Sequence, residues 1–490
     1  MSNRITQEEL NNYLWGSAVI LRSHIDAGAY KQYIFPLLFF KRMSDIYDEE
    51  TEIAVQEYGE EGADFDEIHF FKLPKGFHWN DVRSVSKNVG EAIIHAFKAI
   101  ENANPSLYGI FGNASWTNKE RLPDSLLKDL IEHFSTQKLT LENCPEDELG
   151  NGYEYLIKKF ADDSGHTAQE FYTNRTVVRL MAEILRPSAG ESIYDPTCGS
   201  AGMLITSLSY VKENNEEYRN LKIYGQEINA LTSAIARMNL FLHGVKDFNI
   251  ANADTLEKPA FIENGRLKQF DIVLANPPYS IKQWDREAFS ADKYGRNFLG
   301  VPPQSRADFA FIQHILKSLK YGSGRCAILL PHGVLFRKEE EEMRKELIKT
   351  DMVECVIGIG RNLFFNSPMD ACILICRTRK KENRKSKVLF INAEREVTRK
   401  NAQSFLEAAH ITKIVNAYNQ FENIRGFCSV VDSKQILSNS GRLSIHLYVS
   451  GSEDDQKEID VQSSVSSWIN LSNEFKESYK KLIQISKEIK

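Results

Sequence analysis

One stretch decides the fold of this chain: Asp271-Ile-Val-Leu-Ala-Asn276-Pro277-Pro278-Tyr279-Ser280. Residues 270–275 have the length and the apolar composition of a short buried strand. The strand must stop at Pro277 and Pro278, because neither residue has the backbone N–H that a sheet requires. The chain therefore leaves the sheet as a stiff loop that presents an amide side chain, fixed carbonyl groups and an aromatic ring.

This loop carries the groups needed to hold the exocyclic amine of a base. The amine of adenine is a poor nucleophile, because its lone pair is delocalised into the ring. Two acceptors, the Asn276 side-chain oxygen and the Pro277 carbonyl, would hold its two N–H groups and help localise the lone pair. Tyr279 would stack on the base, an interaction of roughly 1–3 kcal/mol. A base in a duplex reaches such a pocket only by flipping out, at a cost of roughly a few kcal/mol.

Three acidic residues, Asp195, Glu227 and Asp254, each follow an expected strand earlier in the chain. The first strand, residues 192–194, leads through Asp195 into the turn Gly199-Ser200-Ala201-Gly202 and then into a helix. Strand, glycine turn and helix form the first unit of a doubly wound nucleotide-binding sheet. The turn lacks the Gly-Lys-Ser/Thr of a P-loop, and an acid at the strand end disfavours a pyrophosphate. The pattern predicts a cationic cofactor such as S-adenosylmethionine, which carries an ammonium and a sulfonium group.

The other two acids suit the rest of such a cofactor. Glu227 ends the second expected strand, where a carboxylate accepts hydrogen bonds from ribose hydroxyls in many nucleotide sites. Asp254 follows the third strand and would read the adenine amine of the cofactor. A single acid at a strand end is usually a solvated loop residue. Three in succession, followed by Asn276 at a fourth strand end, indicate one site.

A capped helix is expected just before the first of these strands. Thr173 or Asn174 is a good N-cap for a helix whose apolar residues recur over 177–181. The free N–H groups of its first turn suit an anion such as a cofactor carboxylate. The alternative is a capped helix that binds no ligand.

The chain is expected to divide into three parts. Residues 1–150 read as a helical domain without catalytic motifs, and residues 151–400 as the catalytic domain. The catalytic domain is predicted to be an α/β, doubly wound, mostly parallel sheet with an antiparallel strand near one edge. Residues 401–490 form a C-terminal region with a charged amphipathic helix over 469–489, which packs on a partner or folds back. Residues 280–307 are expected to form a long irregular loop beside the site.

The densest basic run, residues 377–387, lies between the last two expected strands and is predicted to be a hairpin tip. It is either a solvated turn or a contact to DNA phosphates. The whole chain has a net charge of −6, from 61 basic and 67 acidic residues. A protein that grips DNA alone is usually basic, so a DNA enzyme of this composition needs a partner.

The remaining composition predicts a cytoplasmic protein without a membrane segment. Its seven scattered cysteines suggest neither a disulfide framework nor a zinc site, and no metal is expected. The N-terminus does not resemble a signal peptide. The early apolar run over 34–40 is too short to span a bilayer.

The sequence Asn276-Pro277-Pro278-Tyr279 resembles the catalytic motif of the amino-methyltransferases, which use S-adenosylmethionine. The same tetrapeptide occurs in enzymes that methylate a glutamine side-chain amide. With the cofactor motifs before it, the region 165–376 resembles the adenine-N6 DNA methyltransferases. Nearly the full chain is similar to the modification subunit of a type I restriction–modification system. The segments Glu170-Phe171-Tyr172-Thr173 and Asn362-Leu-Phe-Phe-Asn366 fit that family as well.

The resemblance implies a role for each motif. Asp195 and Glu227 would hold the methionine end and the ribose of the cofactor, Asp254 would lie near its adenine, and residues 276–279 would hold the target base. The family usually has proline where this chain has Asn174; its loss reduces pre-organisation of the helix start, but asparagine caps well. The other residues that would line the cofactor are Glu170, Phe171, Tyr172, Thr173, Asn174, Arg175, Gly199, Ser200, Ala201 and Gly202.

The family also implies an assembly on duplex DNA. Two copies of this chain would bind one DNA-specificity subunit, joined in the restricting form by two ATP-driven nuclease (restriction) subunits. Three other hypotheses remain open. The chain could be a self-sufficient DNA methyltransferase that reads DNA through residues 280–307 and its C-terminal region, a protein-glutamine methyltransferase, or a non-catalytic scaffold.

Overall fold

The computed structural model describes residues 4–60, 68–163, 173–245, 247–361, 363, 370–400, 403–449 and a few positions between 468 and 476. Three predicted cofactor residues, Glu170, Phe171 and Tyr172, lie outside the described residues, as does most of the expected C-terminal helix.

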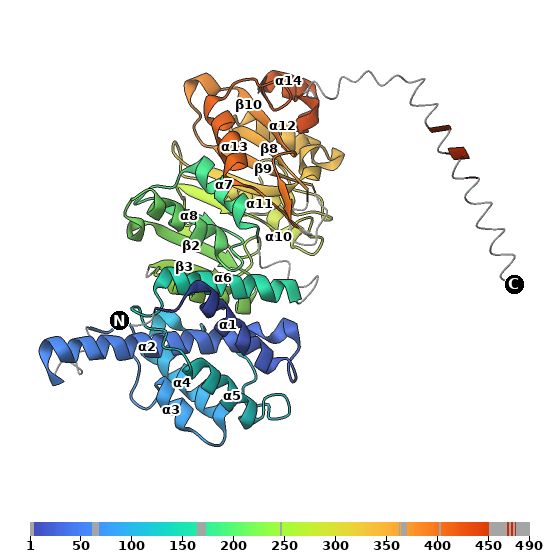
Figure 1. Cartoon of the computed structure of the whole chain (residues 1–490). Helices are drawn as coiled ribbons and strands as arrows, with labels where there is room; N and C mark the ends of the chain where they lie inside the picture. The colour runs from blue at the N-terminus through green and yellow to red at the C-terminus, as the bar shows by residue number, and fades with distance from the viewer. Residues whose placement is uncertain are drawn as a thin grey trace.

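The N-terminal part of the chain is a cluster of helices (Figure 1). Its hydrophobic core contains many aromatic side chains among the aliphatic ones. A capping box at Thr6 and Glu9 fixes the start of the first helix. Phe39 of the second helix contacts Phe241 at a ring-centroid distance of 5.2 Å, so this core continues onto a helix of the sheet domain. The helices are α1 (Gln7–Leu21), α2 (Lys31–Tyr58), α3 (Trp79–Ser84), α4 (Val89–Ala103) and α5 (Asp124–Ser135).

Helix α6 (Glu146–Asp163) joins this helical part to the sheet. Its buried residues belong to the N-terminal core, and it packs against α1 on one side and α9 (Ala230–Leu242) on the other. Helix α6 spans the predicted domain boundary between 150 and 151. The three-part division of the chain stays a prediction.

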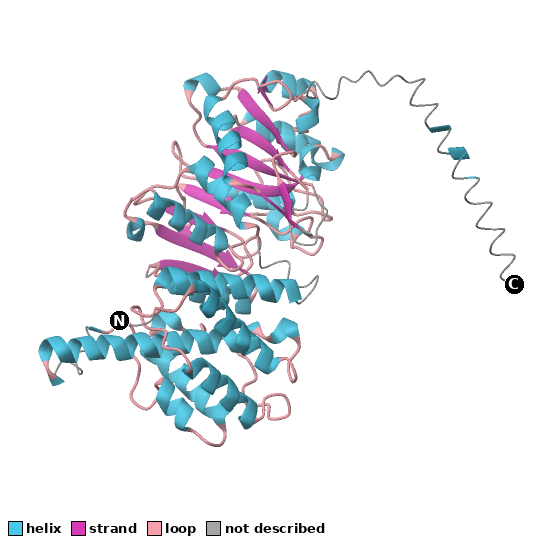
Figure 2. Cartoon of the chain, in the orientation of Figure 1, coloured by secondary structure: helices cyan, strands magenta, loops and turns pink. Residues whose placement is uncertain are grey.

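A single nine-stranded sheet forms the centre of the remaining chain (Figure 2). The strands β9 and β13 run antiparallel to their neighbours, and all other pairs are parallel. An antiparallel strand near an edge was expected; β13 lies at the edge, whereas β9 lies inside the sheet. The spatial order is β13 (Cys428–Asp432), β10 (Lys387–Ala393), β8 (Val353–Ile359), β9 (Ala371–Arg377), β7 (Arg325–Pro331), β6 (Ile272–Ala275), β1 (Ser192–Asp195), β2 (Lys222–Glu227) and β3 (Phe248–Asn252).

Helices cover both faces of this sheet. Successive side chains of a strand point to opposite faces, so a strand that is apolar throughout needs packing partners on both. Ile193 of β1 packs on one face with α7 (Arg175–Leu185), α8 (Gly202–Glu213) and α13 (Ala408–Gln420). Tyr194 packs on the other face with α11 (Asp308–Lys317), α12 (Glu341–Lys349) and α14 (Ser433–Ser438). The prediction of a doubly wound, mostly parallel α/β sheet preceded by helices is confirmed. The remaining elements are α10 (Arg286–Ser290) and the hairpins β4 (Ile262–Glu263) with β5 (Arg266–Leu267) and β11 (Thr398–Lys400) with β12 (Gln403–Phe405).

The basic run 377–387 is not the hairpin tip that the sequence suggested, because β8 lies between β9 and β10. Since β9 is antiparallel to the parallel strands, the run lies at the sheet edge opposite to Asn276. Lys380 is buried and donates to Asp351 and to a backbone carbonyl. Arg384 is buried and donates to the carbonyls that end α13. Two of the basic residues therefore stabilise the fold.

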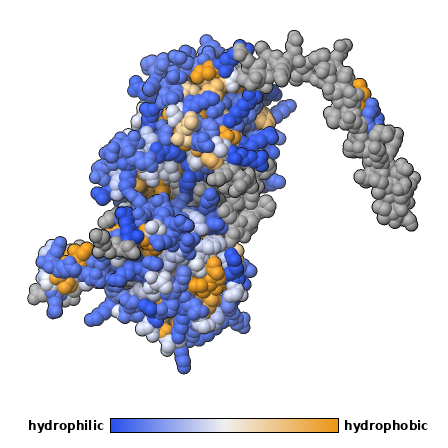
Figure 3. Space-filling model, viewed as in Figure 1, coloured by the Kyte–Doolittle hydropathy of each residue, from blue (hydrophilic) through white to orange (hydrophobic). Residues whose placement is uncertain are grey.

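The face of the molecule seen in Figure 3 is mostly hydrophilic, with separate apolar patches. Across the described part of the chain, none of the helices combines the length and apolar character required to cross a membrane.

Candidate active site

Three of the predicted site residues, Asp195, Glu227 and Asn276, lie at strand ends where the order of strands reverses. Strands β2 and β3 extend from β1 on one side, and β6 and β7 extend on the other. Ile193 and Tyr194 pair with Ile272 and Val273, so Asp195 and Asn276 end two neighbouring parallel strands. Ligands of doubly wound sheets bind at such a switch point, beyond the carboxyl ends of the strands.

The turn after β1 forms a tight cradle of backbone. Asp195 is only 1% exposed, and its Oδ1 accepts a hydrogen bond from the Thr197 N–H at 2.9 Å. Gly199 and Ala201 have φ values of 52° and 67°, in the left-handed region that costs an alanine about 1 kcal/mol or more. Helix α8 then begins at Gly202. The two left-handed residues therefore bend the backbone more sharply before α8 than residues with negative φ would.

The Asp195 carboxyl has an unusual protonation behaviour. Burial, with a smaller contribution from the Glu227 charge, raises the pKa of Asp195 to about 7, and the hydrogen bond from the Thr197 N–H opposes the shift. Among the described residues, no cation pairs with the buried Asp195 carboxyl. A cationic ligand would supply that partner and restore the charged form.

Glu227 ties the end of β2 to the same turn. One carboxylate oxygen accepts from the Gly199 N–H at 3.1 Å, and the other accepts from the Asn229 N–H at 2.8 Å. The next residue, Ile228, is 66% exposed and offers an apolar surface beside two carboxylates. Ile228 was not among the predicted site residues, although its position directly after a strand-ending acid was a usable signal. At the end of β3, Asp254 accepts from the Leu256 and Glu257 N–H groups and so orders its own loop.

The segment 280–307 is folded and contains the short helix α10. Its buried Arg296 pairs with Asp292 and donates to the carbonyls of Thr255 and Leu256 at 3.0 and 2.8 Å. These bonds attach the segment to the loop after β3. The expected irregular loop is therefore fixed on one side of the site.

The loop after β6 presents an unsatisfied acceptor. The Asn276 side chain donates from Nδ2 to the Thr173 hydroxyl at 3.1 Å. Among the described residues, nothing donates to the buried Asn276 Oδ1. Leaving such an oxygen unpaired costs about 1–3 kcal/mol, which a ligand N–H would recover. Asn174 caps α7 as expected, since its Oδ1 accepts from the Thr176 N–H at 3.0 Å.

Arg175, predicted to line the cofactor, is held from outside the site by Glu154 of α6. Its Nε donates to the Glu154 carboxylate at 2.7 Å. The other Glu154 oxygen accepts from Asn239, whose amide also donates to the Ser200 carbonyl at 2.8 Å. A Cβ on Gly202 would lie 1.9 Å from the Arg175 guanidinium, so a larger residue there would displace this side chain from Glu154. Helices α6, α7 and α9 thus support the turn after β1.

We expect the Glu154→Gln substitution to lower the free energy of unfolding by about 2 kcal/mol, because the Glu154 carboxylate is only 16% exposed and is bonded by both Arg175 and Asn239. Burial favours a higher pKa for Glu154, but the Arg175 charge, His243 and the Asn239 amide hold the pKa below its usual range. A depressed carboxyl pKa adds stability above the unfolded-state pKa, and this is lost as the pH falls through the folded-state value. Urea unfolding at pH 7 and in mildly acidic buffer measures both effects.

Glu183→Gln provides the matched control on α7. Its partner Arg179 is a partly exposed i,i+4 neighbour, so the expected loss is below about 0.5 kcal/mol. Equal losses for the two variants would contradict a special role for Glu154.

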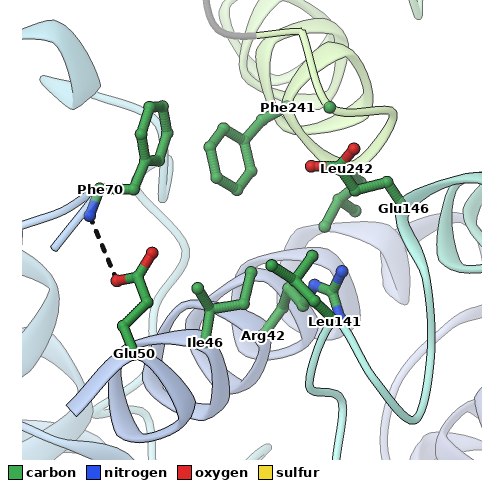
Figure 4. Close-up of a pocket in the computed structure, with 9 residues that line it drawn as sticks. Arg42, Ile46, Glu50, Phe70, Leu141, Glu146, Phe241 and Leu242 are labelled. Carbon is green, nitrogen blue, oxygen red and sulfur yellow. Dashed lines mark hydrogen bonds between the residues drawn. The ribbon is translucent and has the colours of Figure 1, made fainter. Parts of the chain in front are cut away.

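A separate pocket lies between α2 and the C-terminal end of α9 (Figure 4). Helix α9 starts beside the carboxyl end of β2, so its C-terminal end lies at the other edge of the sheet. The pocket is therefore not part of the site at Asp195 and Asn276. It is lined by Arg42, Ile46, Glu50, Phe70, Leu141, Glu146, Phe241, Leu242 and Gly244.

The strand order, the acids after β1 and β2 and the Asn-Pro-Pro-Tyr loop define the class of amino-methyltransferases. Comparison with protein families gives the same class and refines it. The N-6 DNA Methylase family matches residues 145–457, and the HsdM N-terminal domain matches residues 10–134. The chain belongs to the N-6 DNA methylase family, the adenine-specific DNA methyltransferases, as a methylase subunit of a type I restriction–modification system.

Similar proteins span nearly the whole chain. The type I restriction enzyme MjaVIII methylase subunit of Methanocaldococcus jannaschii is 30% identical over 97% of this chain and 84% of its own length. The HindI methylase subunit of Haemophilus influenzae is 30% identical over 85% of this chain and 98% of its own length. The crystal structure of a type I restriction-modification methyltransferase subunit from Streptococcus thermophilus superposes with a TM-score of 0.79 at 30% identity, over 91% of this chain and 100% of that one.

Proposed function

We propose that the loop Asn276–Tyr279 holds an adenine flipped out of duplex DNA, and that S-adenosylmethionine lies across the carboxyl ends of β1, β2 and β3. The observation that carries this proposal is the buried Asn276 Oδ1, which follows the strand next to Asp195 and accepts no hydrogen bond from any residue that the structure describes. The reaction is methyl transfer to N6 of the base.

The residues after β1 and β2 fit this cofactor chemically. The buried Asp195 carboxyl suits its ammonium group, and Glu227 suits the ribose hydroxyls. The exposed Ile228 side chain would pack on the adenine ring, with Asp254 near the ring amine. The Ala201 turn would bring backbone close to the methionine part. The roles of Glu170, Phe171, Tyr172, Thr173, Asn174, Arg175, Gly199, Ser200 and Gly202 as lining residues stay predictions.

When bound, the cofactor supplies an electrophilic methyl group. The work of the chain is to orient the amine that attacks it. Asn276 Oδ1 and the Pro277 carbonyl would accept the two N–H bonds of N6, which localises the nitrogen lone pair. Positive charge develops on N6 during transfer, and two fixed acceptors stabilise that charge without reorganising. Tyr279 would stack on the ring and keep the base out of the duplex.

We further infer that the chain works inside an assembly in the cytoplasm. Its net charge of −6 does not supply the grip on phosphates that a DNA enzyme needs alone. The similar proteins are named as subunits of type I restriction enzymes. A DNA-specificity subunit would read the sequence, two copies of this chain would bind it, and ATP-dependent restriction subunits would join when cleavage is required.

Labelled S-adenosylmethionine tests the subunit hypothesis. We expect the purified chain to bind the cofactor but to transfer no label to unmethylated duplex DNA, and to transfer label to adenine N6 once the specificity subunit is added. Transfer to DNA by the chain alone would make it a self-sufficient enzyme. Label in protein would favour a protein-glutamine methyltransferase, and failure to bind the cofactor would favour a scaffold.

A further inference from the structure

The loop after Tyr279 ends on a buried carboxylate that the reaction itself does not use. Ser280 has a φ of 52°, so this serine holds a left-handed conformation that costs roughly 1–2 kcal/mol. Its N–H donates to Asp308 Oδ1 at 3.0 Å, and its hydroxyl lies 3.5 Å from Asp308 Oδ2. Asp308 is the first residue of α11 and is 1% exposed. One carboxylate therefore keeps the strained turn in place.

Arg337 completes the contact from a third segment. Its Nη1 donates to Asp308 Oδ2 at 2.9 Å, and its Nη2 donates to the Ser280 hydroxyl at 3.3 Å. Arg337 follows β7, the strand next to β6, directly after the short helix η7 (His332–Leu335). A Cβ on Gly333 would lie 2.4 Å from the Arg337 Nε, so the guanidinium lies against bare backbone.

A second buried carboxylate adjoins this arginine. Glu340 has no exposed surface, and its nearest cation is Arg337 Nη1 at 3.6 Å. Burial raises the pKa of Glu340 to about 7, and the Arg337 charge opposes that shift. The charged groups that face Glu340 are Arg337, Asp308, Arg344 and Arg306. The shorter distance makes Asp308 the principal partner of Arg337.

We propose that Asp308 and Arg337 are positioning residues, which hold Ser280 in its left-handed turn and thereby fix Asn276 and Tyr279 on the flipped base. This inference rests on the proposed role of the Asn276–Tyr279 loop. Without the arginine, the turn relaxes toward a negative φ and the loop loses its fixed orientation. A misplacement of about 1 Å at a reacting centre costs up to roughly 100-fold in rate. Neither residue lies at the cofactor-binding ends of β1 and β2, so cofactor affinity is unaffected.

The test uses the complex of this chain with its specificity subunit and two duplexes. One duplex carries adenine at the target position and measures kcat. The other carries 2-aminopurine there, which lacks the 6-amino group and reports only the stacking of the base. We expect Arg337→Gln to lower kcat by about 10- to 100-fold, while the Kd values for S-adenosylmethionine and DNA change less than about twofold. The fluorescence of 2-aminopurine rises, because the base stacks less tightly on Tyr279. Arg337→Lys keeps the charge and retains an intermediate rate. Arg83→Gln, which removes an exposed paired arginine in the N-terminal helices, leaves all values unchanged.

A rescue separates positioning from general stability. Adding Ser280→Gly to Arg337→Gln restores part of kcat, because glycine adopts positive φ without an anchor. Unchanged kcat and fluorescence in Arg337→Gln would overturn the proposal, and so would a rate loss that Ser280→Gly does not reverse. If Arg337→Gln does not fold, Arg337→Lys decides, since an unchanged kcat and fluorescence in that variant would refute positioning. Absence of transfer by the wild-type complex would instead refute the proposed function.

Discussion

We expect replacement of Asn276 with alanine to lower kcat for methyl transfer by at least about 100-fold in the complex with the specificity subunit, because it removes one of the two acceptors proposed to act on the developing charge. Loss of one such fixed group typically costs about 10²–10³ in rate. The Kd for S-adenosylmethionine stays unchanged, since Asn276 ends a different strand from Asp195 and Glu227. Single-turnover transfer of label to duplex DNA, with cofactor binding measured separately, checks both statements.

Two further variants sharpen this result. Asn276→Asp keeps an acceptor oxygen but loses the Nδ2 donor to Thr173, so we expect a rate between wild type and alanine. Asn214→Ala, at the exposed end of α8, serves as the control and leaves kcat unchanged. If Asn276→Ala methylated DNA at the wild-type rate, the Asn-Pro-Pro-Tyr loop would not be the base-holding site.

We expect the affinity for S-adenosylmethionine to increase as the pH rises from 6 to 8, because the proposed contact with its ammonium group needs the charged form of Asp195. Burial places the pKa of this carboxyl at about 7. Well below pH 7 the affinity then falls about tenfold for each pH unit, and above pH 7 it levels off. Asp195→Asn removes this dependence and weakens binding by at least about 30-fold at pH 8, the equivalent of roughly 2 kcal/mol for a lost buried charge pair. Calorimetric titration of the full chain between pH 6 and 8.5 measures the Kd.

The same shift has the opposite effect on folding. A carboxyl whose folded-state pKa is raised binds a proton more tightly in the folded chain, so the free energy of unfolding falls as the pH rises from the unfolded-state pKa toward 7.

For the binding prediction, Asp147→Asn on the exposed side of α6 is the control and keeps the wild-type pH dependence of the Kd. The ratio of Kd values between Asp195→Asn and wild type at each pH cancels titration of the cofactor itself. A constant ratio across the range would contradict the prediction.

Much of this site could be predicted because its signals are local. Proline pairs and acids directly after short apolar runs mark strand ends, and parallel strands bring their carboxyl ends to one edge. The positions of Asp195, Glu227 and Asn276 at neighbouring strand ends followed from that rule alone. The Asn174 cap was also local, since its side chain bonds two residues ahead.

Other features depend on contacts between distant residues. Ser280, Asp308 and Arg337 meet across 57 residues of sequence, and none carries a motif. The insertion of β9 between β7 and β8 turned the expected hairpin at 377–387 into a connection across β8. Strand β13 was not predicted from the sequence, because it pairs with β10 only after the chain has passed through α13.

The continuity of the N-terminal core with α9 and of α6 with the turn after β1 has a thermodynamic consequence. Glu154 is bonded at once to Arg175 and to Asn239, which holds Ser200. A protein that binds the N-terminal helices and shifts α6 would change the conformational free energy of the turn after β1, and with it the affinity for a ligand bound there. By linkage, the cofactor changes the affinity for that protein by the same factor. Titrating partner binding with and without cofactor would therefore measure the energetic coupling between assembly and catalysis in a single number.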